Sequence, residues 1–157
     1  MSVQNTYTRE HVVGFPGSIV DAGLKNIITK LAEASSIGSG LAVTRGTLDD
    51  QALLATATGA EFVGITTSTT AGQADGSDAF VYPEDGAMNI LETGRIYVIC
   101  EDSCVPGDDV FFRHTAAGNE VLGAFRTDAD TADADQITGA TFESTAGAGE
   151  IAIVKLP

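Results

Sequence analysis

The stretch LETGRIYVICEDSCVPGDDVFFRH, residues 91–114, decides the fold because it places two strand-like segments around a tight turn. In residues 95–101, Ile96, Val98 and Cys100 fall on one face of a strand and Arg95 and Glu101 on the other, residues 109–114 form a second strand-like segment, and the PGD sequence between them is typical of a turn. Tyr97 and Ile99 share the face of Arg95 and Glu101, so this second face carries apolar groups too. This strand is therefore expected to be buried on both faces at its centre.

From residue 40 onward the chain repeats this pattern of short apolar segments separated by clusters rich in Gly, Pro, Asn and Asp. Many short strands at such spacing are typical of a sandwich or barrel and not of a parallel sheet with crossover helices. The sequence therefore predicts an all-β fold, a β-sandwich or barrel of short antiparallel strands. The predicted strands are residues 41–45, 61–67, 79–82, 87–91, 95–101, 109–114, 121–126, 140–143 and 149–156.

Residues 1–35 read as an extended N-terminal arm, and residues 36–157 as a β-rich body. Phe15 is held extended by the proline that follows it, and the glycines on either side let the chain bend. Such an arm can insert into a neighbouring molecule or fold back on its own body, and the sequence leaves both open. Residues 21–34 have apolar groups at helical spacing but also a Gly and β-branched residues, so a short helix and an irregular extended arm are both compatible.

Charge is distributed unevenly along the chain, whose net charge is −14. Residues 1–45 hold four basic and three acidic side chains, whereas residues 46–157 hold four basic and 19 acidic ones. The acidic body repels phosphates, which argues against nucleic acid as a partner. The nearly neutral first segment is the part best suited to lie against another protein, although a simple solubilising surface is an alternative reading.

The sequence offers few residues equipped for catalysis. Neither of its two histidines, His11 and His114, stands in a recognisable catalytic motif. The acidic run at residues 128–135 lacks the positions of a calcium-binding EF-hand loop, so a solvated loop is favoured. Cys100 and Cys104 cannot complete a four-ligand zinc site, and reduced structural thiols are expected, with a local disulfide as the alternative. No catalytic residue, cofactor or metal is predicted, and the chain is not expected to be an enzyme.

Four blocks of the chain have a recognisable order. They are VGFPGSIVDAG…IITKLAEAS, then LAVTRGTLDDQALLATATGAEFVGITT, then LETGRIYVICEDSCVPGDDVFFRH, and last LGAFRTDADTADADQITGATFES…GEIAIVKL. In this order they resemble the structural cement, or capsid decoration, proteins of tailed bacteriophages. The resemblance covers nearly the whole chain, from about residue 12 to residue 156.

The resemblance implies a protein on the outer surface of the phage head, at junctions of major capsid proteins, that stabilises the expanded shell against DNA pressure. The implied partners are the major capsid protein and other copies of the chain, as a homotrimer in the first place or a dimer. The protein would be made in the cytoplasm of the host bacterium and would reside in the virion. The expected capsid or subunit interface comprises Val12, Val13, Gly14, Phe15, Pro16, Gly17, Ile19, Leu24, Ile27, Ile28 and Leu31.

Two other functions are compatible with the sequence. A receptor- or glycan-binding protein of the head surface would use the loops at residues 70–78 and 128–135. A hydrolase on a trimeric β-fold would use His114 with nearby carboxylates. The first residues lack the apolar centre of a signal peptide, and no segment approaches the roughly 20 apolar residues that cross a bilayer, so no membrane partner is expected.

Overall fold

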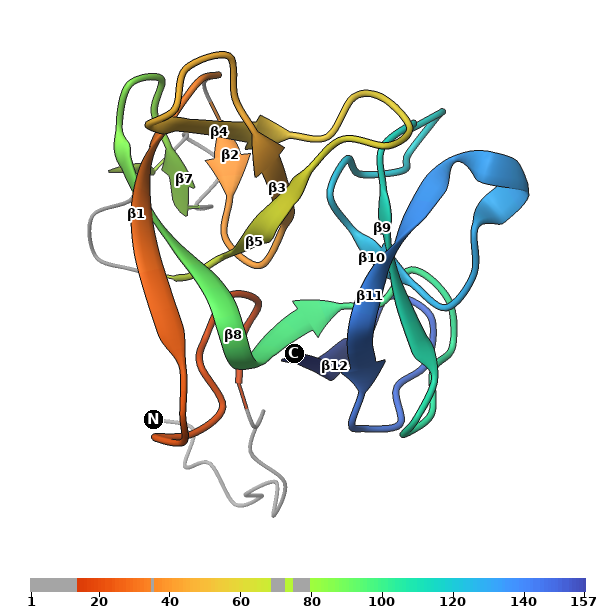
Figure 1. The fold of residues 1–157 in the computed structure, drawn as a ribbon. Helices are drawn as coiled ribbons and strands as arrows, with labels where there is room; N and C mark the ends of the chain where they lie inside the picture. Colours follow the sequence, from red (N-terminus) through yellow and green to blue (C-terminus); the bar gives the residue numbers. More distant parts are fainter. Residues whose placement is uncertain (1–13, 35, 69–72, 75–79) are drawn as a thin grey trace, which may run out of the picture.

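The computed structural model describes residues 14–34, 36–68, 73–74 and 80–157 (Figure 1). Within these ranges the chain forms strands and a single 3-10 turn, η1 (Asp130–Ala132), which confirms the predicted all-β fold. The strands are β1 (Asn26–Ala32), β2 (Ile37–Gly38), β3 (Ala42–Arg45), β4 (Gln51–Leu54), β5 (Phe62–Thr66), β6 (Gln73–Ala74), β7 (Phe80–Tyr82), β8 (Ala87–Ile99), β9 (Asp109–Arg113), β10 (Phe125–Arg126), β11 (Ala134–Phe142) and β12 (Ile151–Leu156).

Two groups of strands share β8, which runs from one to the other (Figure 1). In the first group β1, β4, β3, β5 and β8 are hydrogen-bonded in that order, and β1 also pairs with β8, so the group closes into a small barrel. The second group continues from β8 through β12, β11 and β9 to β10. A bridge between Cys100 and Phe125 returns β10 to the end of β8 and closes this group too. Strands β2, β7 and β6 form a separate small sheet.

Strand β8 passes through the position where the sequence predicted a turn between residues 87–91 and 95–101. Gly94 lies inside this strand at a φ of +128°, a conformation that lets the strand bend without ending. Strand β1 pairs with β8 as far as Thr93, and β12 pairs with it from Gly94 onward. Because these neighbours supply backbone partners along its length, the predicted turn is wrong and the two predicted strands are one.

Residues 26–32 form β1, although the sequence was compatible with a short helix or an irregular extended arm there. The strand pairs antiparallel with β8, from Asn26 opposite Thr93 to Leu31 opposite Ala87, and it pairs in parallel with β4. Its β-branched residues suit a strand better than a helix once these partners are present. The helix is therefore wrong, and this part of the expected arm over residues 1–35 belongs to the main sheet.

Two clusters of buried apolar side chains form the core of the part of the chain that the structure describes. One occupies the second barrel and its junction with the first, and it includes Val98, Phe112, Phe125, Phe142 and Val154. The other joins the first barrel to the small sheet through Ile37, Val43, Tyr82, Met88 and Ile90. In the strand predicted to be buried on both faces, Tyr97 is 8% exposed but Ile99 is 43% exposed, so the prediction holds for the first position and fails for the second.

Candidate functional site

Residues 14–20 lie along the second half of β8 and are bound to it through the backbone. The Gly17 N–H donates to the Tyr97 carbonyl at 2.8 Å, and the Tyr97 N–H donates to the Ser18 carbonyl at 3.0 Å. A Cβ atom on Gly14 would lie 2.4 Å from the Tyr97 ring, so the chain crosses this ring at a distance only glycine allows. Of the two alternatives for the arm, these residues fold back on their own body.

A tight turn at residues 15–18 carries the Phe15 side chain. The Ser18 N–H donates to the Phe15 carbonyl at 2.9 Å, and Gly17 has a φ of +85° after Pro16, as a type II turn requires. A Cβ on Gly17 would lie 2.8 Å from the Gly40 nitrogen, so the turn is pressed against the body. Phe15 itself is 59% exposed. The turn therefore fixes the backbone from which this aromatic side chain extends into solvent.

The loop at residues 21–25 separates this turn from β1, and Asp21 fixes its shape. Asp21 Oδ1 accepts from the Gly23 N–H at 2.8 Å, and Oδ2 accepts from Arg95 Nη1 at 2.6 Å. The Gly23 N–H and the Arg95 guanidinium lower the pKa of Asp21 below its ordinary value. Leu24 lies in this loop and is 98% exposed. The loop thus presents an apolar side chain that no part of the described molecule covers.

The sequence-predicted interface residues fall into three sets. Phe15, Leu24 and Ile27 are the exposed ones. Ile27 lies near the start of β1, next to the loop that carries Leu24. Val12 and Val13 lie outside the described residues. The remaining ones are buried or half-buried and serve the protein's own packing; they are Gly14, Pro16, Gly17, Ile19, Ile28 and Leu31.

A groove of about 520 Å³ lies beside the turn, where Pro16, the segment before β3 and the end of β8 meet the loop before β10. Leu41, Ile99 and Val121 give it mostly apolar walls, and Val121 is 50% exposed. Charged residues also line it, and they are Glu101, Asp102, Arg113, Glu120 and Arg126.

Two arginines next to this groove organise the acidic segment that follows β10. Arg113 is 1% exposed, and its Nε and Nη2 donate to Glu101 at 2.8 Å and to Asp130 at 2.7 Å. Arg126 binds Asp128 and Asp130, each at 2.8 Å. The solvated loop predicted at residues 128–135 holds for Asp128, whose side chain is 67% exposed, whereas Asp130 is half-buried, and arginines bind both carboxylates. In the parts of the chain that the structure describes, no cluster of acidic, His or Cys side chains is placed to hold a metal ion.

Cys100 and Cys104 are free and buried in the core of the second barrel. Burial raises the pKa of both thiols, because a thiolate would lose its hydration there. The protonated thiol is a poor nucleophile and a poor metal ligand. Both cysteines therefore act as small packing groups.

His114 is 2% exposed, and its surroundings do not match a catalytic base. Its Nε2 faces both Thr58 Oγ1 at 3.4 Å and Asp135 Oδ1 at 3.7 Å, while Nδ1 faces Thr115 Oγ1 at 3.0 Å. Thr115 and Asp135 lie on opposite ring nitrogens, but the 3.7 Å between His114 Nε2 and Asp135 Oδ1 is too long for the hydrogen bond that orients a catalytic histidine. Asp135 also accepts from the Gly59 N–H at 2.6 Å, so the cluster ties the loop before β5 to β11.

The other loop considered for glycan binding, residues 70–78, lies outside the described residues except for β6. Across the described ranges, no helix has the length and apolar character needed to pass through a membrane.

The sequence model of the family described as structural cement protein (E217 gp24/Pam3 gp6) matches residues 3–156. The chain belongs to this family. Among solved structures, a chain in "The capsid of Myoviridae Phage XM1" has a TM-score of 0.75 and 16% sequence identity, and the match covers 99% of this chain and 98% of that one. At this identity the likeness shows a shared fold. No curated protein matches the chain.

The cement protein is thus a structural, capsid-associated phage protein, as its resemblance predicted. Sequence reasoning found the exposed Phe15, Leu24 and Ile27 but missed the groove and the arginine pair. One signal for the arginines was present: residues 46–157 hold only four basic side chains against 19 acidic ones, so each arginine has several carboxylates to bind.

Proposed function

We propose that the cement protein attaches to major capsid proteins through the Leu24 face, defined as residues 21–27. The observation that carries this proposal is the 98% exposure of Leu24 on a loop braced by Asp21. Holding a large apolar side chain in water is unfavourable, and burial against a partner would recover about 1.5–3 kcal/mol. Ile27, 41% exposed, extends the apolar surface along β1.

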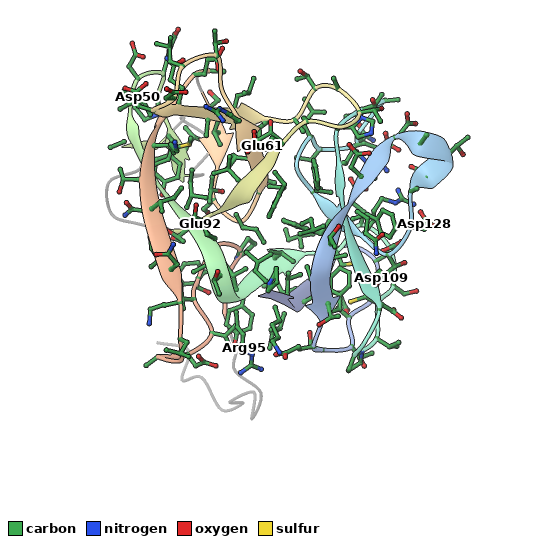
Figure 2. The ribbon with its side chains drawn as sticks, in the orientation of Figure 1. Asp50, Glu61, Glu92, Arg95, Asp109 and Asp128 are labelled. Carbon is green, nitrogen blue, oxygen red and sulfur yellow. The ribbon has the colours of Figure 1, made fainter. Side chains whose placement is uncertain are left out.

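The distribution of charge supports this orientation. The Leu24 face contains Asp21 and Lys25 as its charged residues, and Asp21 is paired with Arg95. The opposite end of the molecule carries exposed carboxylates, among them Asp49 and Asp50. Figure 2 shows Arg95 and Asp50 at opposite ends. With the Leu24 face on the shell, the acidic end would point away from it, on the outside of the virion, and would keep particles apart.

Several such attachments at junctions of capsid proteins would stabilise the expanded shell against the pressure of packaged DNA. Each contact can be small, because linked attachments raise the effective concentration of the others. Copies of the protein that associate with one another would supply this linkage. The protein needs no catalytic step for this role, and it would be made in the host bacterium's cytoplasm, where the heads assemble.

The test is binding of the purified protein to heads that lack it, measured by co-sedimentation, with the heat resistance of the decorated heads as a second readout. Leu24→Asp is expected to weaken binding at least about tenfold, the equivalent of about 1.4 kcal/mol. The matched control is Leu48→Asp, since Leu48 is 58% exposed beside Asp49 and Asp50, away from the Leu24 face. The proposal would be overturned if the unmodified protein showed no saturable binding to the heads, or if the two variants bound equally well.

A further inference from the structure

We infer that the first half of β1 receives an extended, acidic segment of the major capsid protein as an added β-strand. The receiving part is called the β1 edge below, and it consists of the backbone N–H and C=O groups of Ile27 and Thr29 that face away from β8. The inference rests on the proposed function, which puts the neighbouring Leu24 face on the shell. It goes further by naming the form in which the partner binds.

The first half of β1 has a strand partner on one side. β8 runs along β1 from Asn26 to Leu31. On the other side β4 meets β1 at Leu31 and Ala32, near its end (Figure 1). Within the described ranges, no strand pairs with this other side of residues 26–30. A strand edge of this kind is a template on which a segment of another protein can pair.

The register shows which backbone groups face the open side. Neighbouring residues of a paired strand direct their N–H and C=O groups to opposite sides. The Ala32 N–H donates at 2.9 Å to the carbonyl that directly precedes β8, whereas the Leu31 N–H donates at 2.8 Å to the Asp50 carbonyl, away from β8. The register has no shift from Ile27 onward. Ile27 and Thr29 are an even number of residues from Leu31, so their backbone groups also face away from β8.

The β1 edge suits an incoming strand. Ile27, Ile28 and Thr29 are β-branched, and such residues favour the extended backbone that a sheet needs. No proline interrupts residues 26–32, although proline is a common protection of strand edges. Ile27 is 41% exposed and Thr29 is also exposed. Between the register shift at residues 26–27 and the contact with Asp50 there is room for about four extended residues, at about 3.3 Å each.

Charge selects an acidic partner. Lys25 and Lys30 stand at the two ends of the β1 edge. Lys25 is exposed, and Lys30 Nζ donates to the backbone carbonyl of Asp49, a contact that does not neutralise its charge. In a chain of net charge −14, two cations beside an open strand favour a segment that carries carboxylates. The same net charge disfavours another copy of this chain as the occupant.

The first experiment is hydrogen–deuterium exchange of the unmodified protein, free and bound to heads that lack it, read at single amides by electron-transfer fragmentation. In the free protein, the Ile27 and Thr29 amides should exchange faster than those of Ile28 and Lys30, which face β8. On the heads, the Ile27 and Thr29 amides should slow at least about tenfold. Protection of both amides in the free protein would show that the chain covers its own edge. That result, or unchanged exchange on the heads, would overturn the inference.

The second experiment separates the backbone of Thr29 from its side chain. Thr29→Pro removes an N–H that faces away from β8, a position where a strand tolerates proline. It should keep the circular dichroism of the unmodified protein and bind heads at least about tenfold more weakly. Thr29→Val is the matched control, because it also loses the hydroxyl but keeps the N–H, and its affinity should stay within about twofold. Equal binding of the two variants would overturn the inference, and the exchange experiment decides it should Thr29→Pro not fold.

The third experiment identifies the occupant. Decorated heads are treated with a carbodiimide, which joins a lysine amine and a nearby carboxylate as an amide and takes up the water that is lost. Peptide mapping is expected to join Lys25 or Lys30 to an acidic residue of the major capsid protein. Links from these lysines to another copy of this chain alone would overturn the inference.

The outcomes distinguish this inference from the Leu24 proposal. Weak binding of Leu24→Asp together with unchanged exchange at Ile27 and Thr29 would retain the Leu24 face and overturn the added strand. Equal binding of Leu24→Asp and Leu48→Asp, with Ile27 and Thr29 protected on the heads, would overturn the Leu24 proposal and retain the added strand.

Discussion

Arg113 Nη2 donates to Asp130 Oδ2 at 2.7 Å, and this pair joins a buried arginine to a segment with left-handed backbone. Asp130, Thr131 and Ala132 have φ values of 41°, 58° and 76°. Residues with a Cβ pay roughly 1–2 kcal/mol each in this region, so the turn needs support from outside itself. Arg113 and Arg126 provide it, since both bind the same Asp130 oxygen.

Replacing Arg113 with Met should destabilise the protein by about 3–5 kcal/mol, because Glu101 and Asp130 would remain beside the core without their main counter-charge. Urea unfolding followed by circular dichroism measures this loss. Arg45→Met is the matched control: Arg45 binds Asp49 at 2.6 Å but its side chain is 53% exposed. Its loss should stay within about 1 kcal/mol, and equal losses for the two variants would contradict the role given to Arg113.

Two glycines with similar backbone conformation allow the cost of backbone strain to be distinguished from the cost of steric contact. Gly17 and Gly59 have φ values of 85° and 75°, but a Cβ on Gly17 would lie 2.8 Å from the Gly40 nitrogen, while one on Gly59 would meet nothing within 4 Å. Gly59→Ala should cost about 1–2 kcal/mol of unfolding free energy from backbone strain alone. Gly17→Ala should cost clearly more, because the turn must also move off the body. Equal losses in urea unfolding would show that the contact with Gly40 does not constrain the turn.

The two buried cysteines should resist thiol reagents in the folded protein. Burial raises the pKa of Cys100 and Cys104, so thiolate is scarce and access is poor. With DTNB we expect negligible reaction at neutral pH and release of two equivalents after unfolding in urea, from the two cysteines of the chain. Val121→Cys serves as the positive control, since Val121 is 50% exposed. Rapid labelling of the unmodified protein, or a mass lower by two hydrogens, would refute this.

Strands rich in β-branched and aromatic residues, with turn residues near their ends, could be predicted from the sequence. β3, β5 and β9 lie within the predicted segments 41–45, 61–67 and 109–114. β4, with the sequence QALL, shows no alternation and was missed. β1 was not predicted because its apolar groups also fit helical spacing, and only the distant partner β8 decides between the two forms. Local pattern therefore failed where long-range pairing determined the structure.

The candidate site could likewise be predicted only in part from the sequence. Sequence spacing could name Leu24, Ile27 and Ile28 as apolar, but it could not tell which of them a partner strand would leave in solvent. Exposure at Leu24 follows from the loop that Asp21 and Arg95 fix, and these residues are 74 positions apart in the chain. The groove beside Pro16 combines several distant segments, so no local motif marks it.

Asp21 gives a prediction on pH that tests the bracing of the Leu24 loop. Its pKa in the folded protein lies below the ordinary 3.8, so the stability it contributes is complete above about pH 4 and is lost as pH falls through the folded pKa. Asp21→Asn should therefore lower the melting temperature at neutral pH, and its difference from the unmodified protein should shrink below about pH 4, where the carboxyl of the latter becomes protonated. Thermal melts between about pH 7 and pH 2 measure this. A difference that stays constant across this range would mean that the charge of Asp21, paired with Arg95 at 2.6 Å, does not hold the loop.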